Sequence, residues 1–307
     1  MQAMPEVAVV GSINVDRSVE VPEPPRRGAT LLGGPVLRGP GGKGANQAVA
    51  LARLGRTTAM IGAVGRDPDG MWMREVLAAE RVSVDGVEEV DEHTGQAFVF
   101  VEPNGESTIV VSPGANMALS AATVERHAET ISAARAVLAQ QEIPETCIER
   151  AAELCTGIFV LNPAPPRPLS YQALSRVDIL VPNRHELTSL LGVDDSCELE
   201  DLVTLASRLP VSQAIVVTLG EEGALVVKDG TYVHIPAVPV RAVDATAAGD
   251  TFCAALVDGL LEGWDVVDAV RWAVRVAAVT TERAGAMTAI PSRAEVESRF
   301  GLFVPSG

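Results

Sequence analysis

The second half of the chain alternates short apolar segments with longer amphipathic ones, and this alternation constrains the fold more than any other feature. Short, mostly apolar runs predict strands at 136–139, 158–162, 179–182, 214–219 and 224–228. Apolar periodicity predicts helices near 121–131, 145–155, 186–191, 199–208, 249–261 and 266–281. This rhythm favours an α/β fold with a central, mostly parallel sheet that is flanked by helices on both faces.

The first half contains segments that depart from this rhythm. Buried strands are predicted at 7–13 and 58–64, and helices at 45–54 and 70–80. Exposed strands are predicted at 17–21 and roughly 29–37, and a hairpin at 95–112 turns at Asn104-Gly105. We therefore expect a single domain over residues 1–307, with a small β-sheet lid formed by about 15–40 and 93–112. The lid would lie over the carboxyl edge of the main sheet, where such folds bind ligands.

Composition and charge exclude several classes of protein. The chain has 307 residues, of which 47% are hydrophobic, so it can build a globular core. Its net charge is -16, and its densest basic spot is Arg26-Arg27, so we expect no nucleic-acid partner. An acidic protein that binds an anionic ligand must supply positive potential locally, from helix N-termini, a lysine or a metal ion.

Several absences of pattern indicate a cytoplasmic protein. Charged residues interrupt the longest apolar region, 251–281, so we expect no membrane partner. The first residues lack basic side chains ahead of the apolar run, so we expect no signal peptide. The four cysteines and four histidines are scattered without the spacing of a zinc site.

Residues 39–49 read GPGGKGANQAV, a glycine cluster that enters a predicted helix. The glycines match the G-x-G-x-x-G dinucleotide fingerprint, but they do not follow the first strand, where that fingerprint belongs. The stretch is not a P-loop either, because Gly44 follows Lys43 where a Ser or Thr should hold Mg²⁺. A plain glycine turn before a helix is one interpretation. Lys43 and Asn46, three apart at a helix start with free backbone N–H groups, favour recognition of hydroxyls.

A second motif, GSINVD, ends the first predicted strand at residues 11–16. Asn14 and Asp16 are two apart, so in an extended chain their side chains point the same way. An amide and a carboxylate on one side can hold vicinal hydroxyls. The alternative is an Asx turn that follows a strand.

The third motif, VDATAAGDTF at residues 243–252, leads from a loop of small residues into a long helix. Asp250 could merely complement the helix dipole. However, the small residues 247–249 leave backbone N–H groups uncovered, which makes an anion pocket at a helix N-terminus. A carboxylate beside such a pocket can take a proton from a hydroxyl while the pocket holds a transferring phosphoryl group. Cys253, one turn on, is expected to pack rather than to act as a nucleophile.

Two weaker motifs follow predicted strands. Asn183 to Glu186 could place an amide and a carboxylate near phosphate and metal, although alone the segment is an ordinary helix start with an Asn N-cap. Residues 218–223 (TLGEEG) are, by themselves, a plain hairpin loop.

Together, and in this order, these motifs resemble those of the ribokinase family of carbohydrate kinases, also called the PfkB family. The resemblance covers essentially the whole chain, and AAGDTF is highly specific for the superfamily. GGKGANQA and GSIN are closer to ribokinases than to fructokinases or adenosine kinases. The resemblance implies ATP-dependent phosphorylation of D-ribose at its 5-hydroxyl to give D-ribose 5-phosphate. Deoxyribose, fructose or a nucleoside such as adenosine or uridine remain alternative substrates, and a non-catalytic sugar sensor is a remote alternative.

The resemblance also implies roles for individual residues. The base would be Asp250, and the backbone of Ala247, Ala248 and Gly249 would form an anion hole. The sugar site would also contain Asn14, Asp16, Gly42, Lys43, Asn46 and Glu142, the last within AQQEIP. The ATP site would be lined by Asn183, Thr218, Leu219, Gly220, Glu221, Glu222, Gly223 and Gly249, while Glu186 would act through the shell of Mg²⁺.

Ribokinases also bind a monovalent cation, mainly through carbonyl groups, beside the anion hole. The matching positions for K⁺ are Asp244, Thr246, Thr280, Arg283, Gly285 and Ala289. The last family position is often a serine, so Ala289 removes a hydroxyl ligand. The family resemblance further implies a homodimer that pairs through the lid.

Overall fold

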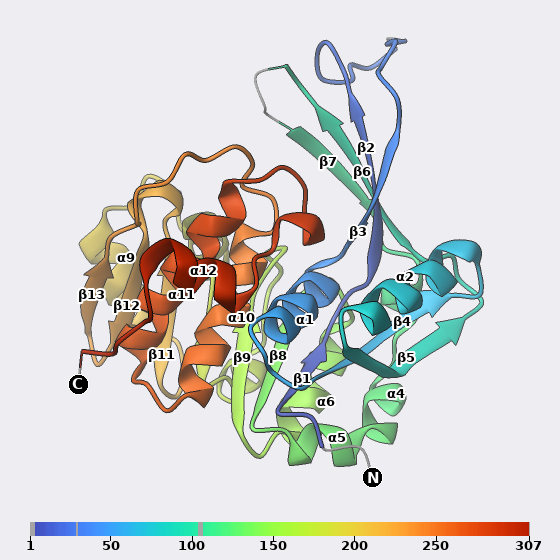
Figure 1. Ribbon diagram of the computed structural model, residues 1–307. Coiled ribbons are helices and arrows are strands. Elements are labelled where there is room, and N and C mark those ends of the chain that lie inside the picture. Colours follow the sequence, from blue (N-terminus) through green and yellow to red (C-terminus); the bar gives the residue numbers. More distant parts are fainter. Residues whose placement is uncertain (1–3, 29, 104–106, 307) are drawn as a thin grey trace.

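The computed structural model describes residues 4–28, 30–103 and 107–306, which form two β-sheets and the helices around the larger one (Figure 1). The large sheet has the order β13-β12-β11-β10-β9-β8-β1-β4-β5. Its strands are β1 (Val7–Val10), β4 (Thr58–Gly65), β5 (Val82–Val90), β8 (Ala136–Gln140), β9 (Ile158–Asn162), β10 (Ile179–Leu180), β11 (Ala214–Thr218), β12 (Ala224–Lys228) and β13 (Thr231–Ile235). The strands pair in parallel except at β12 and β13, which confirms the predicted fold class.

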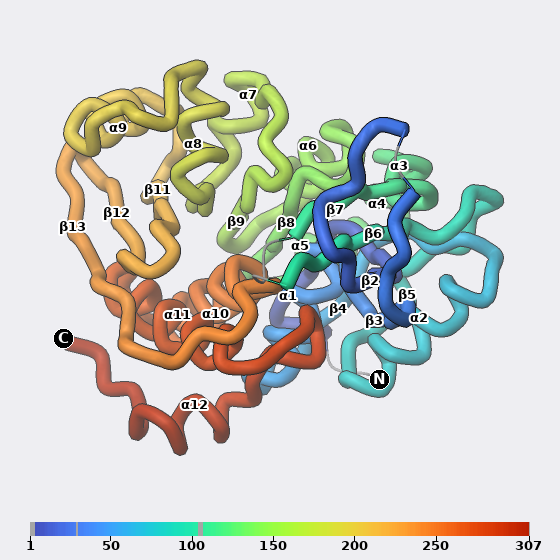
Figure 2. Tube along the Cα trace, turned by 90° about the horizontal axis from the view of Figure 1, so that it is seen from above, coloured from blue at the N-terminus to red at the C-terminus, as the bar shows by residue number. Residues whose placement is uncertain are grey.

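Helices cover both faces of the large sheet because its strands are apolar on both sides. In β1, Val7 and Val9 contact one core cluster, whereas Ala8 and Val10 contact the other. Figure 2 shows the two helix layers from above, on opposite sides of the strands. One layer contains α1 (Lys43–Arg53), α2 (Pro68–Ala79), α10 (Ala248–Leu261), α11 (Val266–Thr281) and α12 (Arg293–Phe300). The other contains α3 (Ala115–Ala118), α4 (Ala121–Arg126), α5 (Ala128–Ala133), α6 (Glu145–Leu154), α7 (Tyr171–Leu174), α8 (Arg184–Leu191) and α9 (Leu199–Ala206).

The small sheet has the order β3-β2-β6-β7 and consists of β3 (Leu37–Gly41), β2 (Asn14–Glu20), β6 (Gly95–Val101) and β7 (Ser107–Ser112). The chain passes from β1 almost directly into β2, so this sheet rises from the carboxyl edge of the large one (Figure 1). The predicted hairpin is confirmed as β6 and β7, which pair from Gln96 with Ser112 to Val101 with Ser107. Its Asn104-Gly105 turn lies outside the described residues.

The strand predicted at 29–37 was wrong. The extended segment that pairs with β2 is β3, which begins at Leu37 and runs through the glycine cluster to Gly41. Gly33, Gly34 and Pro35 interrupt the earlier segment. Pro40 is tolerated within β3 because that strand lies at the edge of its sheet, where a missing N–H breaks no ladder.

Other differences from the predictions have local causes. The helix expected at 121–131 is divided at His127, whose φ of -105° and ψ of 22° end α4 before α5 begins. β5, β13 and α12 were not predicted. β5 and β13 are edge strands: acidic residues interrupt the apolar residues of β5, and all but the last residue of β13 are exposed, so neither contains an apolar run. α12 buries Val296 alone among its own residues and is mostly polar. Within the described residues, no helix is both long and apolar enough to cross a membrane.

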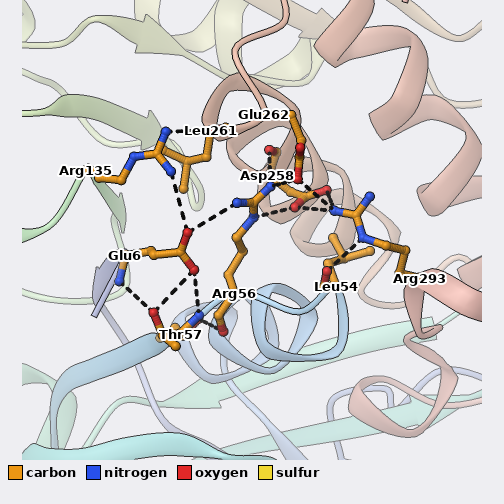
Figure 3. Close-up of polar contacts among 10 residues, drawn as sticks. Glu6, Leu54, Arg56, Thr57, Arg135, Asp258, Leu261, Glu262 and Arg293 are labelled. Atoms are coloured by element: carbon orange, nitrogen blue, oxygen red, sulfur yellow. Dashed lines mark hydrogen bonds and ion pairs between the residues drawn. The ribbon is translucent and has the colours of Figure 1, made fainter. Parts of the chain in front are cut away.

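A buried carboxylate ties three separate parts of the chain together (Figure 3). Asp258 of α10 has a fully buried side chain and accepts hydrogen bonds from Arg56 Nε (2.6 Å) and Trp272 Nε1 (2.8 Å). Arg293 Nη2, from α12, donates to both of its oxygens at 2.7 Å. Arg56 also pairs with Glu6, just before β1. This cluster anchors α10, whose first turn carries Asp250.

We expect Asp258→Ala to lower the free energy of unfolding by about 3–5 kcal/mol, because it leaves two arginines without their shared buried partner. Denaturant unfolding followed by circular dichroism measures the change. The matched control is Asp91→Ala, which removes an ion pair with Arg66 whose side chains are 62% and 90% exposed. That loss should cost about 0–1 kcal/mol. Equal losses in the two variants would contradict the role of the cluster.

Candidate active site

The first part of the site forms where α1 begins against β2. Gly42 precedes α1 with a φ of 90°, a conformation that favours glycine. A Cβ there would lie 2.6 Å from the backbone nitrogen of Asn14. The glycine therefore allows the start of α1 to pack directly on β2. This contact brings Lys43, the first residue of α1, next to the strand that carries Asn14 and Asp16.

Asn14 and Asp16 lie two apart on β2, as predicted. Asn14 is buried, and its Oδ1 accepts a hydrogen bond from Asn116 Nδ2 (2.7 Å). Asp16 fits against β3 because residue 41 is glycine: a Cβ there would lie 2.3 Å from each carboxylate oxygen. Burial, and then the negative charges of Glu142 and Asp250, raise the pKa of Asp16 to about 6. These three carboxylates therefore face one space.

Glu142 follows β8 and is held against the start of α1. Its Oε2 accepts hydrogen bonds from the hydroxyl of Ser12 and from the backbone N–H of Lys43 (3.2 Å). Ser12 Oγ in turn accepts from the N–H of Gly44 (3.3 Å). The predicted sugar-site residues of β2, α1 and the segment after β8 thus lie together.

Asp250 lies in the first turn of α10 and is 7% exposed. Its Oδ2 accepts a hydrogen bond from Asn46 Nδ2 (2.9 Å), and its Oδ1 accepts one from Gln47 Nε2 (3.1 Å). Burial raises the pKa of Asp250, against the opposing effects of the Lys43 charge and the two amide donors. The carboxylate is therefore both desolvated and held at each oxygen, which suits a general base.

Lys43 supplies positive charge to this acidic site. Burial alone would lower its pKa, but the carboxylates of Asp250, Glu142 and Glu186 outweigh burial and raise it. The ammonium therefore stays charged at neutral pH. It provides the local positive potential that an acidic protein needs to handle an anionic ligand.

A cavity beside Asp250 brings two of the predicted sugar-site residues, Lys43 and Asp250, together with residues predicted for the nucleotide. It is lined by Lys43, Asn162, Asn183, Glu186, Thr218, Ala247, Gly249 and Asp250, among others. A Cβ built on Gly249 would meet no atom within 4 Å, so this residue faces open space. The loop residue Ala247 has a φ of 61° and precedes α10, and the N-terminus of this helix borders the cavity because Ala247, Gly249 and Asp250 line it. The N–H of Ala248, however, donates to Ala245 O (3.1 Å) within the turn.

Asn183 and Glu186 form a capping box at the start of α8. Asn183 Oδ1 accepts from the N–H of Glu186 (2.7 Å), and Glu186 Oε2 accepts from the N–H of Asn183 (2.8 Å). Burial is the largest influence on Glu186 and raises its pKa. Asn183 also pairs with Thr218 at the end of β11. The residues after Thr218, Leu219 to Gly223, form the predicted turn into β12, with a short 3₁₀ helix at Gly220–Glu222.

The predicted cation positions come from two loops that lie side by side. Asp244 Oδ1 accepts from the N–H and the hydroxyl of Thr246 (2.9 and 2.6 Å), and its Oδ2 accepts from the N–H of Gly285 (2.8 Å). These bonds outweigh burial and lower the pKa of Asp244. The N–H of Asp244 also donates to Thr281 O (3.2 Å), which closes the loop on the end of α11.

The side chains at three further predicted cation positions, Thr280, Arg283 and Ala289, are either bonded to other groups or carry no oxygen. Thr280 is buried in α11 and donates its hydroxyl to Val276 O (3.2 Å). The Arg283 side chain is engaged with Glu295 (2.6 Å). Ala289 is fully buried at the end of a 3₁₀ turn, Met287–Ala289. Among the described residues, no group of three or more His, Cys, Asp or Glu side chains could hold a metal ion.

Sequence reasoning missed several polar side chains of the site. These are Ser12, Gln47, Asn116, Gln140 and Asn162, all of which are buried. Ser12 and Gln47 lie inside the motifs GSINVD and GGKGANQA, next to residues that were assigned a role, and that position was the available signal. Asn116, Gln140 and Asn162 follow or end ordinary apolar segments, and only their hydrogen bonds reveal them.

Comparison with known proteins agrees with this arrangement. The model of the pfkB family of carbohydrate kinases matches residues 4–293. This chain belongs to the pfkB family. It is 38% identical to ribokinase of Schizosaccharomyces pombe, over 97% of this chain and 99% of that protein. It is also 38% identical to ribokinase of Haemophilus influenzae, over 94% and 96%. The structure of Arabidopsis thaliana ribokinase complexed with ribose and ATP superposes with a TM-score of 0.89 and 30% identity, covering 96% of this chain and 98% of that one.

The raised pKa of Asp16 predicts that sugar binding by this pfkB kinase weakens in acid. A carboxylate accepts hydroxyl hydrogen bonds when ionised, and Asp16 loses its charge as the pH falls through about 6. Between pH 7.5 and pH 5, we expect the Kd for D-ribose, the sugar implied by the sequence, to rise about tenfold. Titration calorimetry measures it. In Asp16→Asn, binding should be weak at both pH values and lose most of this dependence. A wild-type Kd that stays constant would remove Asp16 from sugar recognition.

Proposed function

We propose that this pfkB-family protein transfers the γ-phosphoryl group of ATP to the 5-hydroxyl of D-ribose. The observation that carries the proposal is the buried Asp250 carboxylate, which both faces polyol-binding groups and borders the cavity at the N-terminus of α10. Two further facts support the choice of substrates. The relatives at 38% identity are named ribokinases, and the Arabidopsis relative was solved with ribose and ATP.

The sugar side of the site matches a polyol. Asp16, Glu142 and Asn14 offer oxygen acceptors, and the Lys43 ammonium offers donors. Asn46 Oδ1 is buried and has no hydrogen-bond partner among the residues that the structure describes. Since buried polar atoms are normally paired, this oxygen fits the role of an acceptor for a sugar hydroxyl.

Asp250 would act as the base for the transfer. As the 5-oxygen attacks the γ-phosphorus, its proton passes to the Asp250 carboxylate, and the bond from phosphorus to the β,γ-bridging oxygen breaks to release ADP. The Lys43 charge and the N-terminus of α10 would stabilise the phosphoryl oxygens. Because the Ala248 N–H is used within its turn, Gly249 rather than Ala248 would contribute the backbone donor here.

Two metal ions fit the residues present. Glu186 lines the cavity with a hard oxygen donor, and it would hold Mg²⁺ through water beside the phosphates. When bound, Mg²⁺ neutralises charge on the β- and γ-phosphates. Asp244 holds the loops of Thr246 and Gly285 together through hydrogen bonds to its carboxylate, and backbone carbonyl groups of these loops would hold K⁺. Ala289 supplies no hydroxyl there, so K⁺ would be held by fewer oxygen ligands.

We expect Mg-ATP and D-ribose to give rapid release of ADP, and the rate to rise when K⁺ replaces Na⁺. The assay should include 2-deoxyribose, fructose, adenosine and uridine as alternative acceptors, each with both cations. Turnover of a nucleoside or hexose without ribose would overturn the proposed substrate. Equal rates in K⁺ and Na⁺ would overturn the cation site.

The control for this assay is Asp250→Asn, which keeps the size of the side chain but removes the base. It should lower kcat at least ~10²-fold while ribose binding persists. An unchanged kcat would remove Asp250 from its role as base, whichever sugar proves to be the substrate.

We also propose that residues 1–307 form one unit in which the small sheet acts as a lid and pairs with the lid of a second copy. The small sheet carries large apolar side chains that are solvent-exposed. Leu37, Ile109 and Val110 are 63%, 55% and 54% exposed, and Phe98 and Val111 are 37% and 44% exposed. Leu37 and Ile109 lie on one face of the sheet, and Phe98 and Val110 lie on the other. Pairing of two lids would bury one of these faces and cover the sheet edges.

The double variant Ile109→Asp/Val110→Asp should therefore be monomeric by sedimentation velocity, while the wild type sediments as a dimer. A matched control is Leu302→Asp/Val304→Asp, in which the changed side chains are 75% and 79% exposed but lie near the C-terminus. The control should remain dimeric. A monomeric wild type, or a dimeric lid variant, would refute pairing through the lid.

A further inference from the structure

Two buried glutamines form a chain of hydrogen bonds that ends on Asp250. Gln47, in α1, is fully buried, and its Nε2 donates to Asp250 Oδ1 (3.1 Å). Its Oε1 accepts from Nε2 of Gln140 (2.6 Å), the last residue of β8, which is also fully buried. Both lie within stretches already singled out, GGKGANQA and AQQEIP, but neither side chain is among the residues predicted to contact sugar or nucleotide.

Gln140 holds the Gln47 amide in the orientation that the carboxylate requires. A side-chain amide has one oxygen that only accepts and one nitrogen that only donates. An ionised carboxylate only accepts, so the Gln47 nitrogen faces Asp250, and Gln140 donates to the oxygen at the other end of that amide. The Gln140 oxygen has no partner among the described residues. The second N–H of Gln47 lies near Asn162 Oδ1 (3.5 Å). Gln140 itself fits because residue 11 is glycine, where a Cβ would lie 1.9 Å from Gln140 Oε1.

The two oxygens of Asp250 accept hydrogen bonds from two amides, which differ in whether their other polar atoms have protein partners. Oδ2 is bonded to Asn46, whose own oxygen has no partner among the described residues and suits the sugar. Oδ1 is bonded to Gln47, whose polar atoms are all engaged by protein groups. Gln47 therefore acts on the reaction only through Asp250.

We propose that Gln47, oriented by Gln140, is a positioning residue that aims the Asp250 carboxylate at the acceptor hydroxyl and keeps it ionised. The inference rests on the proposed role of Asp250 as base. A donor to the charged form of a carboxylate lowers its pKa, and so opposes the rise that burial causes at Asp250.

Other charged and titratable groups also face Asp250, from several elements. These are Lys43 on α1, Asp16 on β2, Glu142 after β8, Glu186 on α8 and Cys253 on α10. None of them accepts or donates a hydrogen bond with Gln47 in the described part of the chain. A change confined to the Gln47 amide therefore reports on its own contact with Asp250.

The test uses Gln47→Met, which has similar volume but cannot donate to the carboxylate. We expect kcat to fall about 10- to 100-fold, with KM for ATP within about threefold of the wild type. In acid, kcat is limited by the fraction of Asp250 that is ionised. The low-pH side of the plot of kcat against pH, its acid limb, should therefore move to higher pH in this variant. The expected shift is about one pH unit, the value of one hydrogen bond to a charged group. Gln140→Met should move the limb in the same direction by less.

The matched control is Gln141→Met. Gln141 adjoins Gln140 and is equally buried, but its amide donates to Arg167 O (3.3 Å), away from Asp250. This variant should leave the acid limb in place, and thermal unfolding will show that all variants fold. If Gln47→Met lowers kcat equally at every pH, with the limb unmoved, its role is merely structural and the proposal fails.

A second readout does not depend on activity. The carboxyl ¹³C resonance of Asp250, assigned by its loss in Asp250→Asn, should titrate at higher pH in Gln47→Met than in the wild type. An inactive wild type would refute the proposed function and leave this titration as the test of the Gln47 contact. An active wild type with identical titrations in both proteins would refute the inference about Gln47 and leave the proposed function standing.

Discussion

The buried carboxylate of Asp250 is the group on which the rest of the site depends. It lies at the start of α10, and its two oxygens are held by amides of α1 that precede it by 204 and 203 residues in the chain. A desolvated carboxylate without donors would be costly, so the packing of α1 against α10 and the chemistry of the site require each other. The Asp258 cluster, two turns further along α10, holds the same helix from its other end.

The charged groups around Asp250 influence one another because they are buried together. Several carboxylates approach one another at the carboxyl edge of the large sheet, and the Lys43 ammonium is the basic group that the structure places among them. Burial, and then the nearby charges of Glu142 and Asp250, raise the pKa of Asp16, whereas the same two carboxylates hold Lys43 in its charged form. The chain is therefore acidic overall yet carries a local positive charge where the transferring phosphoryl group would lie.

The glycines of residues 39–42 allow two close approaches of the backbone to other parts of the site. Gly39 and Gly41 lie in an edge strand, where Gly41 leaves room for the carboxylate of Asp16, and Gly42 lets the start of α1 touch β2. The same few residues thus place the small sheet, the first acceptor of the sugar and the amino end of α1. A substitution in this stretch would disturb all three, because each depends on a close approach of backbone.

The local sequence pattern was enough to predict much of the fold and of the site. The apolar runs predicted most strands of the large sheet, and the motifs around Lys43, Asp250 and Asn183 marked residues that the fold brings to one cavity. Only the tertiary structure decided that Gly39 to Gly41 form a strand, that polar β5 and β13 close the edges of the large sheet, and that Gln140 orients Gln47 toward Asp250. The physical reason is that edge strands and buried amides are satisfied by distant partners, and such pairing leaves no periodicity in the sequence around them.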